Sequence, residues 1–283
     1  MNLPFNISLE KKVAVVTGGA GVLCGAMVDA LAKCGAKVAI LDLNLERAQQ
    51  KANEVKANGG IAIGIEANVL SKESLKKAHD TILKVFGPCN ILINGAGGNH
   101  SKGNTTKEYL FSEDLNNEEL TTFFDLDPEG VEFVFNLNFL GTLMPTQEFA
   151  KDMINNKGCT IINISSMNAF TPLTKIPAYS GAKAAVSNFT QWLAVHMSKV
   201  GIRVNAIAPG FFITAQNEKL LLNEDGSYTE RANKIITNTP MERFGQVEEL
   251  TGTLLYLVCE EASSFVNGVV IPVDGAFSAY SGV

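Results

Sequence analysis

The sequence is poor in the residues that build metal centres and disulfide frameworks. Its 283 residues include three isolated histidines (His79, His100 and His196) and no H-E-x-x-H motif. The five cysteines are scattered and form no C-x-x-C pair. This spacing indicates small buried thiols in a reducing compartment rather than disulfides or metal ligands. We therefore expect no catalytic metal.

Long apolar runs are also absent. No segment approaches the roughly 18 unbroken apolar residues that a membrane span needs. Near the start, Pro4, Asn6 and Ser8 interrupt the apolar residues, which is not typical of a signal peptide. We therefore expect a cytoplasmic protein without a membrane partner.

Positive charge is scarce too. Lysine and arginine number 23 against 29 aspartates and glutamates, for a formal net charge of −6. Without a basic patch, a nucleic-acid partner is not expected. Hydrophobic residues make up 46% of the chain, which favours a compact protein of this length with one large core.

The apolar segments that are present alternate in type. Short β-branched runs are separated by segments such as 45–60, "LERAQQKANEVKANGG", whose apolar residues recur three and four apart. This alternation predicts an α/β fold with a single Rossmann-type, doubly wound parallel sheet of about seven strands and helices on both faces, residues 1–283 forming one domain. The expected strands are Val13–Thr17, Lys37–Asp42, Ile61–Ala67, Asn90–Gly97, Thr160–Ser166, Arg203–Gly210 and Val269–Gly275.

Two long polar inserts, at 99–130 and 211–239, interrupt the alternation of expected strands and helices. The first has weak helical character around Glu118–Phe124. Each follows the carboxyl end of an expected strand, which is where open α/β sheets bind ligands. Long irregular segments within a domain are usually functional, so we expect both inserts to lie over an active site.

The stretch "TGGAG" follows the first expected strand and leads into a helix that begins near Val22. A glycine backbone can approach phosphate closely, and a helix N-terminus offers free N–H groups. By itself a glycine-rich turn is a weak signal. Asp42, at the end of the second strand, can accept hydrogen bonds from ribose hydroxyls and repels a 2′-phosphate. This favours NAD(H) over NADP(H), although the positive charges of Lys37 and Arg47 would favour NADP(H).

The segment "YSGAK" places Tyr179 and Lys183 on one face of an expected helix. A free tyrosine titrates near ~10, and a neighbouring ammonium is expected to lower that pKa, making Tyr179 a usable acid or base. Ser166, at the end of the fifth strand, can hydrogen-bond the same substrate oxygen. A Y-x-x-x-K pair is common by chance, but its position after a Ser-Ser strand end favours hydride-transfer chemistry with nicotinamide.

With "TGGAG", "NGAG", "NFLGT", "YSGAK", "GIRVNAIAPG" and "VNGVVIPVDG", residues 13–275 resemble the short-chain dehydrogenase/reductase family. The resemblance implies a catalytic tetrad of Asn138, Ser166, Tyr179 and Lys183, with Asn138 holding a water that links Lys183 to solvent. It also implies homotetramers, formed partly through the Tyr179 helix and the last strand. With the glycine loop and Asp42, the cofactor-binding set becomes Gly18, Gly19, Gly21, Val22, Leu23, Asp42, Leu43, Asn68, Val69, Asn94, Ala96, Gly97, Tyr179, Lys183, Pro209, Gly210, Phe212 and Thr214.

The chain departs from the family pattern around its glycines. Val22 and Cys24 stand where glycine is usual, and Gly95 stands where a second asparagine is more common. The lost amide places one hydrogen bond between sheet and helix in doubt. We expect Cys24 to lie at a helix N-terminus beside the cofactor, with a thiol more acidic than usual.

The inserts and nearby loops supply amides and cations that suit a polyhydroxylated substrate with a carboxylate. "GAGGNH", "FFDLDPEG", "SSMNAFTPLTKIPAYSGAKAA" and "PGFFIT" resemble the fructuronate reductase (D-mannonate oxidoreductase) branch, which implies NADH-dependent reduction of D-fructuronate to D-mannonate. The alternatives are a gluconate 5-dehydrogenase-like or other polyol or keto-sugar enzyme, and a non-catalytic NAD-sensing protein. The expected substrate contacts are Asn99, His100, Lys102, Met167, Asn168, Gln216, Asn217 and Arg231.

Overall fold

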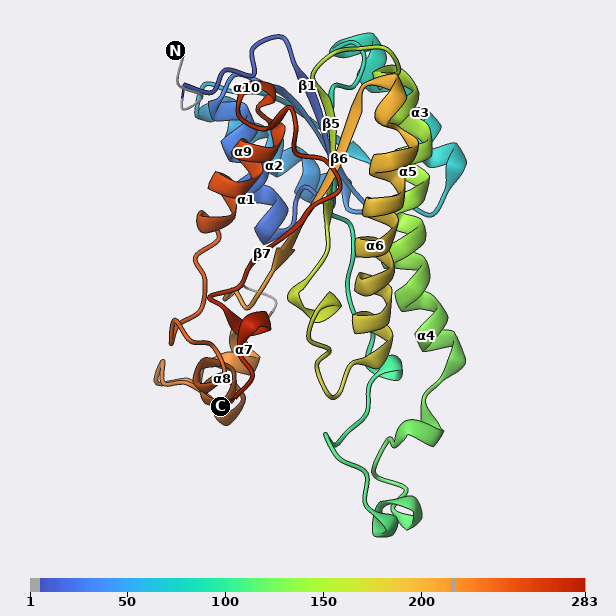
Figure 1. The fold of residues 1–283 in the computed structure, drawn as a ribbon, viewed down its shortest axis with the longest axis vertical. Helices are drawn as coiled ribbons and strands as arrows, with labels where there is room; N and C mark the ends of the chain where they lie inside the picture. Colours follow the sequence, from blue (N-terminus) through green and yellow to red (C-terminus); the bar gives the residue numbers. More distant parts are fainter. Residues whose placement is uncertain (1–5, 215–216, 283) are drawn as a thin grey trace.

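A seven-stranded parallel sheet forms the centre of the molecule, which we describe from a computed structural model covering residues 6–214 and 217–282 (Figure 1). The strand order is β3-β2-β1-β4-β5-β6-β7, and every neighbouring pair is parallel. The expected Rossmann-type α/β fold is confirmed. The strands are β1 Val13–Thr17, β2 Lys37–Asp42, β3 Ile61–Glu66, β4 Ile91–Asn94, β5 Cys159–Ile164, β6 Ile202–Pro209 and β7 Val270–Val273.

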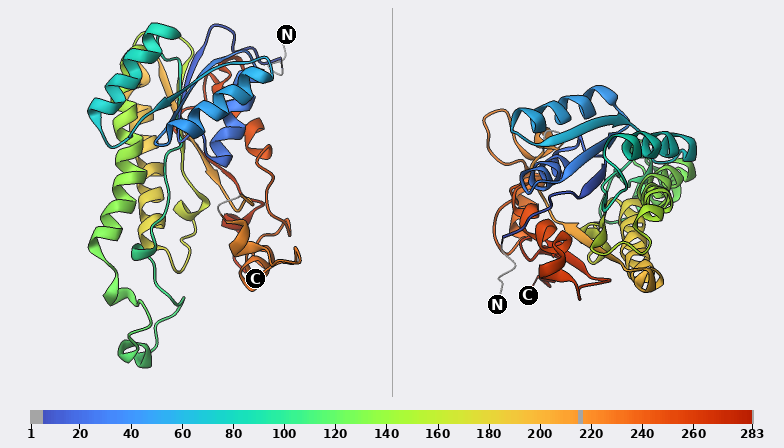
Figure 2. Two further views of the ribbon diagram at one scale, coloured as in Figure 1. Left: turned by 180° about the vertical axis from the view of Figure 1, so that it is seen from behind. Right: turned by 90° about the horizontal axis from the view of Figure 1, so that it is seen from above.

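Helices cover both faces of the sheet (Figure 2). Because successive strand residues point to opposite faces, Ala14 and Val16 of β1 join one core cluster, whereas Val13 and Val15 join the other. The first cluster packs under α1 (Val22–Lys33), α2 (Leu45–Ala57) and α9 (Glu249–Val258). The second packs under α3 (Lys72–Val85), α5 (Gly141–Phe149) and α6 (Pro177–His196). The remaining α-helices of the described residues are α4 Pro128–Phe135, α7 Glu218–Leu221, α8 Glu230–Thr237 and α10 Glu260–Ser263.

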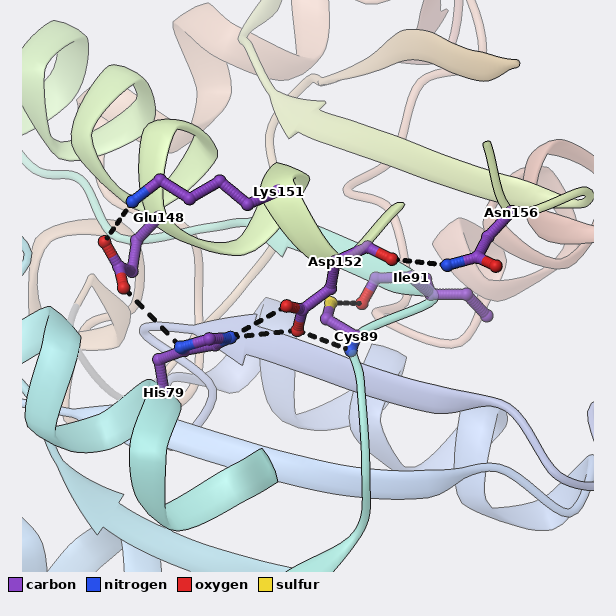
Figure 3. Close-up of polar contacts among 7 residues, drawn as sticks. All are labelled: His79, Cys89, Ile91, Glu148, Lys151, Asp152 and Asn156. Atoms are coloured by element: carbon purple, nitrogen blue, oxygen red, sulfur yellow. Dashed lines mark hydrogen bonds and ion pairs between the residues drawn. The ribbon is translucent and has the colours of Figure 1, made fainter. Parts of the chain in front are cut away.

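A half-buried polar cluster ties α3 to the end of α5 (Figure 3). His79 Nε2 lies 2.9 Å from Asp152 Oδ2, and His79 Nδ1 lies 3.5 Å from Glu148 Oε1. The Asp152 carboxylate also accepts a hydrogen bond from Cys89 N at 3.0 Å. His79 is thus a satisfied structural histidine, and within the described residues no group of three or more His, Cys, Asp or Glu side chains could hold a metal ion.

The two inserts extend beyond the carboxyl edge of the sheet (Figure 1). The weak helical character around Glu118–Phe124 does not produce an α-helix: the chain there forms short turns, including the 3₁₀ turn Phe123–Asp125, before α4 begins at Pro128. Side chains satisfy this backbone locally: Asn117 Oδ1 accepts from Glu119 N and Asp125 Oδ2 from Thr122 N. Such bonds compete with a helix. The second insert carries α7 and α8. None of the helices in 6–214 and 217–282 is long and apolar enough to cross a bilayer.

Candidate active site

A cavity of about 400 Å³ opens at the carboxyl ends of the strands. It lies by β1 and β4, where the strand order reverses and where open α/β sheets bind ligands. Thirteen of the expected cofactor residues line it: Gly18, Gly21, Val22, Leu23, Asp42, Ala96, Gly97, Tyr179, Lys183, Pro209, Gly210, Phe212 and Thr214. The glycine loop, the acidic strand end and the Tyr-Lys pair therefore face one space.

The loop after β1 requires glycine. Gly18 has φ +63°, and a Cβ added there would lie 3.0 Å from the backbone of Ala96. Gly21, the residue before α1, gives that helix no side-chain cap, so its first-turn N–H groups stay available to a ligand. A glycine backbone leading into an uncapped helix start is suited to bind a pyrophosphate.

At the carboxyl end of β2, Asp42 Oδ1 accepts a hydrogen bond from Asn44 N at 3.1 Å. Arg47 reaches back from α2 and donates from Nη2 to Ala20 O at 3.0 Å. Both residues line the cavity. The contact of Arg47 with the loop could not be predicted from its charge, because it depends on the turn between β2 and α2.

Lys183 projects from α6 into the cavity wall and is almost completely buried, at 4% exposed. Its ammonium donates to Ile164 O at 2.7 Å. Nζ lies 5.6 Å from the centre of the Tyr179 ring, one helical turn away. Burial away from water lowers the pKa of Lys183 to about 8.

Tyr179 differs from the expectation for its pKa. Burial raises the pKa of the phenol, and a hydrogen bond with Ser166 opposes that rise only in part. The predicted lowering by Lys183 is wrong for this state of the site, because the ammonium is turned toward the Ile164 carbonyl. The phenol is therefore held protonated, the form that can donate a proton to a substrate oxygen.

Asn138 lies in a π-helical turn, Asn136–Leu140, between α4 and α5. Its Nδ2 donates to Gly98 O and Val134 O, both at 2.7 Å, and its Oδ1 accepts from Gly98 N. The side chain thus fixes the loop after β4 beside Lys183. The water that Asn138 was expected to hold stays a prediction.

Cys24, the third residue of α1, also lines the cavity. The expectation of an acidic thiol is wrong. Cys24 is only 5% exposed, and burial raises its pKa to about 12. The cost of removing a thiolate from water outweighs the stabilisation that the helix N-terminus would give it, so the thiol of Cys24 stays neutral and shielded.

Five expected cofactor residues lie off the cavity wall. Gly19 packs toward Ile40, and Val69 is buried beside Gly141. The Asn94 side chain is buried, and its Nδ2 donates to Thr146 on α5 and to Asn163 on β5, both at 2.9 Å. The bond to Thr146 connects β4 with α5, whereas Gly95, which has no side chain, contributes no side-chain hydrogen bond of its own. The other two, Leu43 and Asn68, are exposed.

The expected substrate residues are dispersed. In the first insert, His100 Nδ1 accepts from Lys102 N, Lys102 pairs with Asp127 at 3.0 Å, and Asn99 donates to Asn104. Asn217 does line the cavity, where its side chain bonds Thr214 N and Phe212 O and closes the turn.

Of the others, Met167 and Asn168 are buried after β5, and Asn168 Oδ1 has no hydrogen-bond partner among the described residues. Arg231 is exposed on α8, and Gln216 lies outside the described residues. Four further residues line the cavity that were not predicted to contact a ligand, namely Gly98, Ile164, Ser165 and Phe211; all but Ile164 lie within quoted motifs, but their contribution to the wall depends on the path of the folded loops.

Comparison with known proteins shows the family of the chain. A family model described as "short chain dehydrogenase" matches residues 12–225. The chain belongs to the short-chain dehydrogenase family. As a member, it is an oxidoreductase, and the Tyr179–Lys183 pair lies in the matched region.

Relatives match this chain over nearly its whole length. An "Uncharacterized oxidoreductase" from Haemophilus influenzae is 60% identical over 100% of this chain and 99% of its own. "Uncharacterized oxidoreductase UxuB" from Bacillus subtilis is 50% identical, covering 99% of this chain and 100% of the relative. A crystal structure of a "putative D-Mannonate oxidoreductase" from Haemophilus, with bound NAD, superimposes with a TM-score of 0.94 at 59% identity and full coverage of both chains.

Proposed function

We propose that this short-chain dehydrogenase reduces the 5-keto group of D-fructuronate to D-mannonate with NADH. The observation that carries the proposal is the single cavity that brings the glycine loop, Asp42, Ser166, Tyr179 and Lys183 together. The substrate is supported by the 59% identity with the mannonate-oxidoreductase structure.

The cavity fits a dinucleotide. The uncapped start of α1 and the glycine loop would hold the pyrophosphate, and Asp42 would bind the adenosine ribose. Pro209 and Gly210, at the end of β6, lie on the same cavity wall as Tyr179 and would contact the nicotinamide. Bound NADH supplies the hydride for the reduction.

The residues of the chain then handle the proton. Ser166 and the protonated Tyr179 hydrogen-bond the substrate carbonyl oxygen and hold it in place. As negative charge develops on that oxygen, the Tyr179 phenol gives up its proton. Turned from Ile164 O toward Tyr179, whose ring centre lies 5.6 Å away, the Lys183 ammonium would stabilise the phenolate that remains.

The test is a screen of NADH oxidation across D-fructuronate, 5-keto-D-gluconate, simple keto acids and a 3-oxoacyl thioester. D-Fructuronate should be turned over with the highest kcat/KM. Tyr179→Phe should lose turnover by at least about a thousandfold, while its NADH Kd stays near that of the wild type. Efficient reduction of another carbonyl without D-fructuronate turnover would reject the substrate, and unchanged turnover in Tyr179→Phe would reject the mechanism.

A further inference from the structure

The side chain of Cys24 occupies the space that a side chain at residue 95 would need. A Cβ added to Gly95 would lie 2.2 Å from Cys24 Sγ, far inside any tolerated contact. The same Cβ would lie 3.6 Å from Cys24 Cβ, which is ordinary van der Waals distance, and 2.9 Å from Thr17 O. The sulfur and the Thr17 carbonyl oxygen both therefore disfavour a side chain at residue 95, and the sulfur makes the closer contact.

The loop beneath this sulfur supports the catalytic groups. Gly95 N and Ala96 N both donate to Thr17 Oγ1, at 3.1 and 3.2 Å. A Cβ added to Gly97 would lie 2.7 Å from Asn138 Oδ1 and 3.2 Å from Lys183 Nζ. A displacement of the loop at residue 95 would thus reach both side chains.

We propose that Cys24 is a positioning residue whose sulfur replaces a side chain at residue 95, filling the space between α1 and the loop after β4 and thereby fixing Gly97 against Asn138 and Lys183. Both departures from the family pattern, a cysteine at 24 and a glycine at 95, then belong to one packing arrangement. The thiol acts by its volume, since burial keeps it neutral.

The test compares Cys24→Ala, Gly95→Ala and the double variant. The first readout is the NADH Kd from fluorescence titration, which needs no carbonyl substrate. Gly95→Ala should weaken NADH binding by at least about tenfold because the new methyl overlaps the sulfur. Cys24→Ala should weaken binding by about threefold through the cavity that it leaves. In the double variant the two methyls meet at an ordinary distance and the 2.9 Å approach to Thr17 O remains, so the Kd should recover by at least about threefold from that of Gly95→Ala.

The second readout is the pH profile of NADH-linked turnover, measured with the best substrate of the screen above. Loosening of the loop at Gly97, whose Cβ position lies 3.2 Å from Lys183 Nζ, admits water and relieves the burial that holds the pKa of Lys183 at about 8. Cys24→Ala should therefore move the alkaline limb of the profile to higher pH, and the double variant should move it back. A purely structural role for Cys24 would lower the melting temperature without shifting this limb.

Cys34→Ala and Gly252→Ala are the matched controls and should leave both readouts unchanged. Cys34 follows the same helix α1, and a Cβ at Gly252 would meet nothing within 4 Å. A double variant that binds NADH no better than Gly95→Ala, or an alkaline limb that does not move in Cys24→Ala, would overturn the proposal. Should Gly95→Ala fail to fold, recovery of folding and NADH affinity in the double variant supports the proposal, and its absence rejects it. A wild-type protein that binds NADH but ignores D-fructuronate would reject the substrate alone.

Discussion

At the scale of single residues, the pKa of Lys183 sets the expected pH dependence. Burial lowers that pKa to about 8, so Lys183 is charged below this pH and neutral above it. Carbonyl reduction needs the ammonium beside Tyr179, whose own pKa is raised. The kcat/KM for reduction should therefore fall as the pH rises through about 8, by about tenfold per further pH unit.

Initial rates between pH 6 and 10 check this dependence. Lys183→Arg is the informative comparison because a guanidinium does not titrate in this range. Any activity that it retains should be flat across pH 8. A wild-type profile that is itself flat to pH 10 would show that Lys183 is not the group that titrates.

A second prediction at this scale concerns Asp42. Its carboxylate at the end of β2 should repel a 2′-phosphate, whereas Arg47 in the same cavity would attract one. Asp42→Ser should lower the preference for NADH over NADPH by at least about tenfold, measured as the ratio of kcat/KM values. Adding Arg47→Ala to Asp42→Ser should reduce the gain in NADPH use, and an unchanged ratio in Asp42→Ser would show that Asp42 does not select the cofactor.

At the scale of elements, an ion pair joins the two inserts. The Glu108 carboxylate, in the first insert, pairs with Lys234 on α8 in the second. The hydrogen bond with Lys234 holds the pKa of Glu108 below its usual value. The pair is partly exposed, with side chains 26% and 61% accessible, so its contribution is at most about 1 kcal/mol. We expect so weak a pair to let the two inserts separate and rejoin readily.

The ion pair between Glu108 and Lys234 can be tested by reversing its charges. Glu108→Lys and Lys234→Glu should each raise the KM for the carbonyl substrate by about twofold to fivefold, with little change in kcat. The double swap should restore the KM. High salt should shrink all these differences, because exposed ion pairs are screened. A double swap whose effect is the sum of the single effects would show that the inserts are not coupled through this pair.

The elements also show what the sequence could predict. β1 and β2 were predicted to the residue, and the other strands within about three residues, because β-branched runs report buried strands directly. The turns of the first insert could not be predicted in this way, because they depend on hydrogen bonds to side chains, such as that from Thr122 N to Asp125 Oδ2. In the site, the motifs placed Tyr179 and Lys183 together. Their pKa directions depend on burial and, for Tyr179, also on the hydrogen bond with Ser166, which only the folded chain reveals.

At the scale of the whole molecule, apolar side chains remain exposed on the helices beside the site. Trp192 and Val195 on α6 are 56% and 76% exposed, and Phe133 and Phe135 on the adjacent α4 are 46% and 37% exposed. Figure 1 shows these two helices on one flank of the molecule. Exposed patches of this kind are typical of subunit interfaces. We therefore expect this face to be shared between copies in a homotetramer.

Light scattering after gel filtration tests this assembly. The wild type should have the mass of four chains, and Val195→Asp should shift the mass to smaller species because it buries a charge in the interface. Gln49→Asp, the same charge change at an exposed position on α2, should leave the mass unchanged. A monomeric wild type, or an intact tetramer in Val195→Asp, would contradict the proposed interface.

The most direct test of the central claim is the identity of the product formed when the purified protein is given D-fructuronate and NADH. We expect D-mannonate, one molecule for each NADH oxidised, and no product from Tyr179→Phe. Failure to consume NADH, or formation of the C5 epimer of D-mannonate instead, would contradict it.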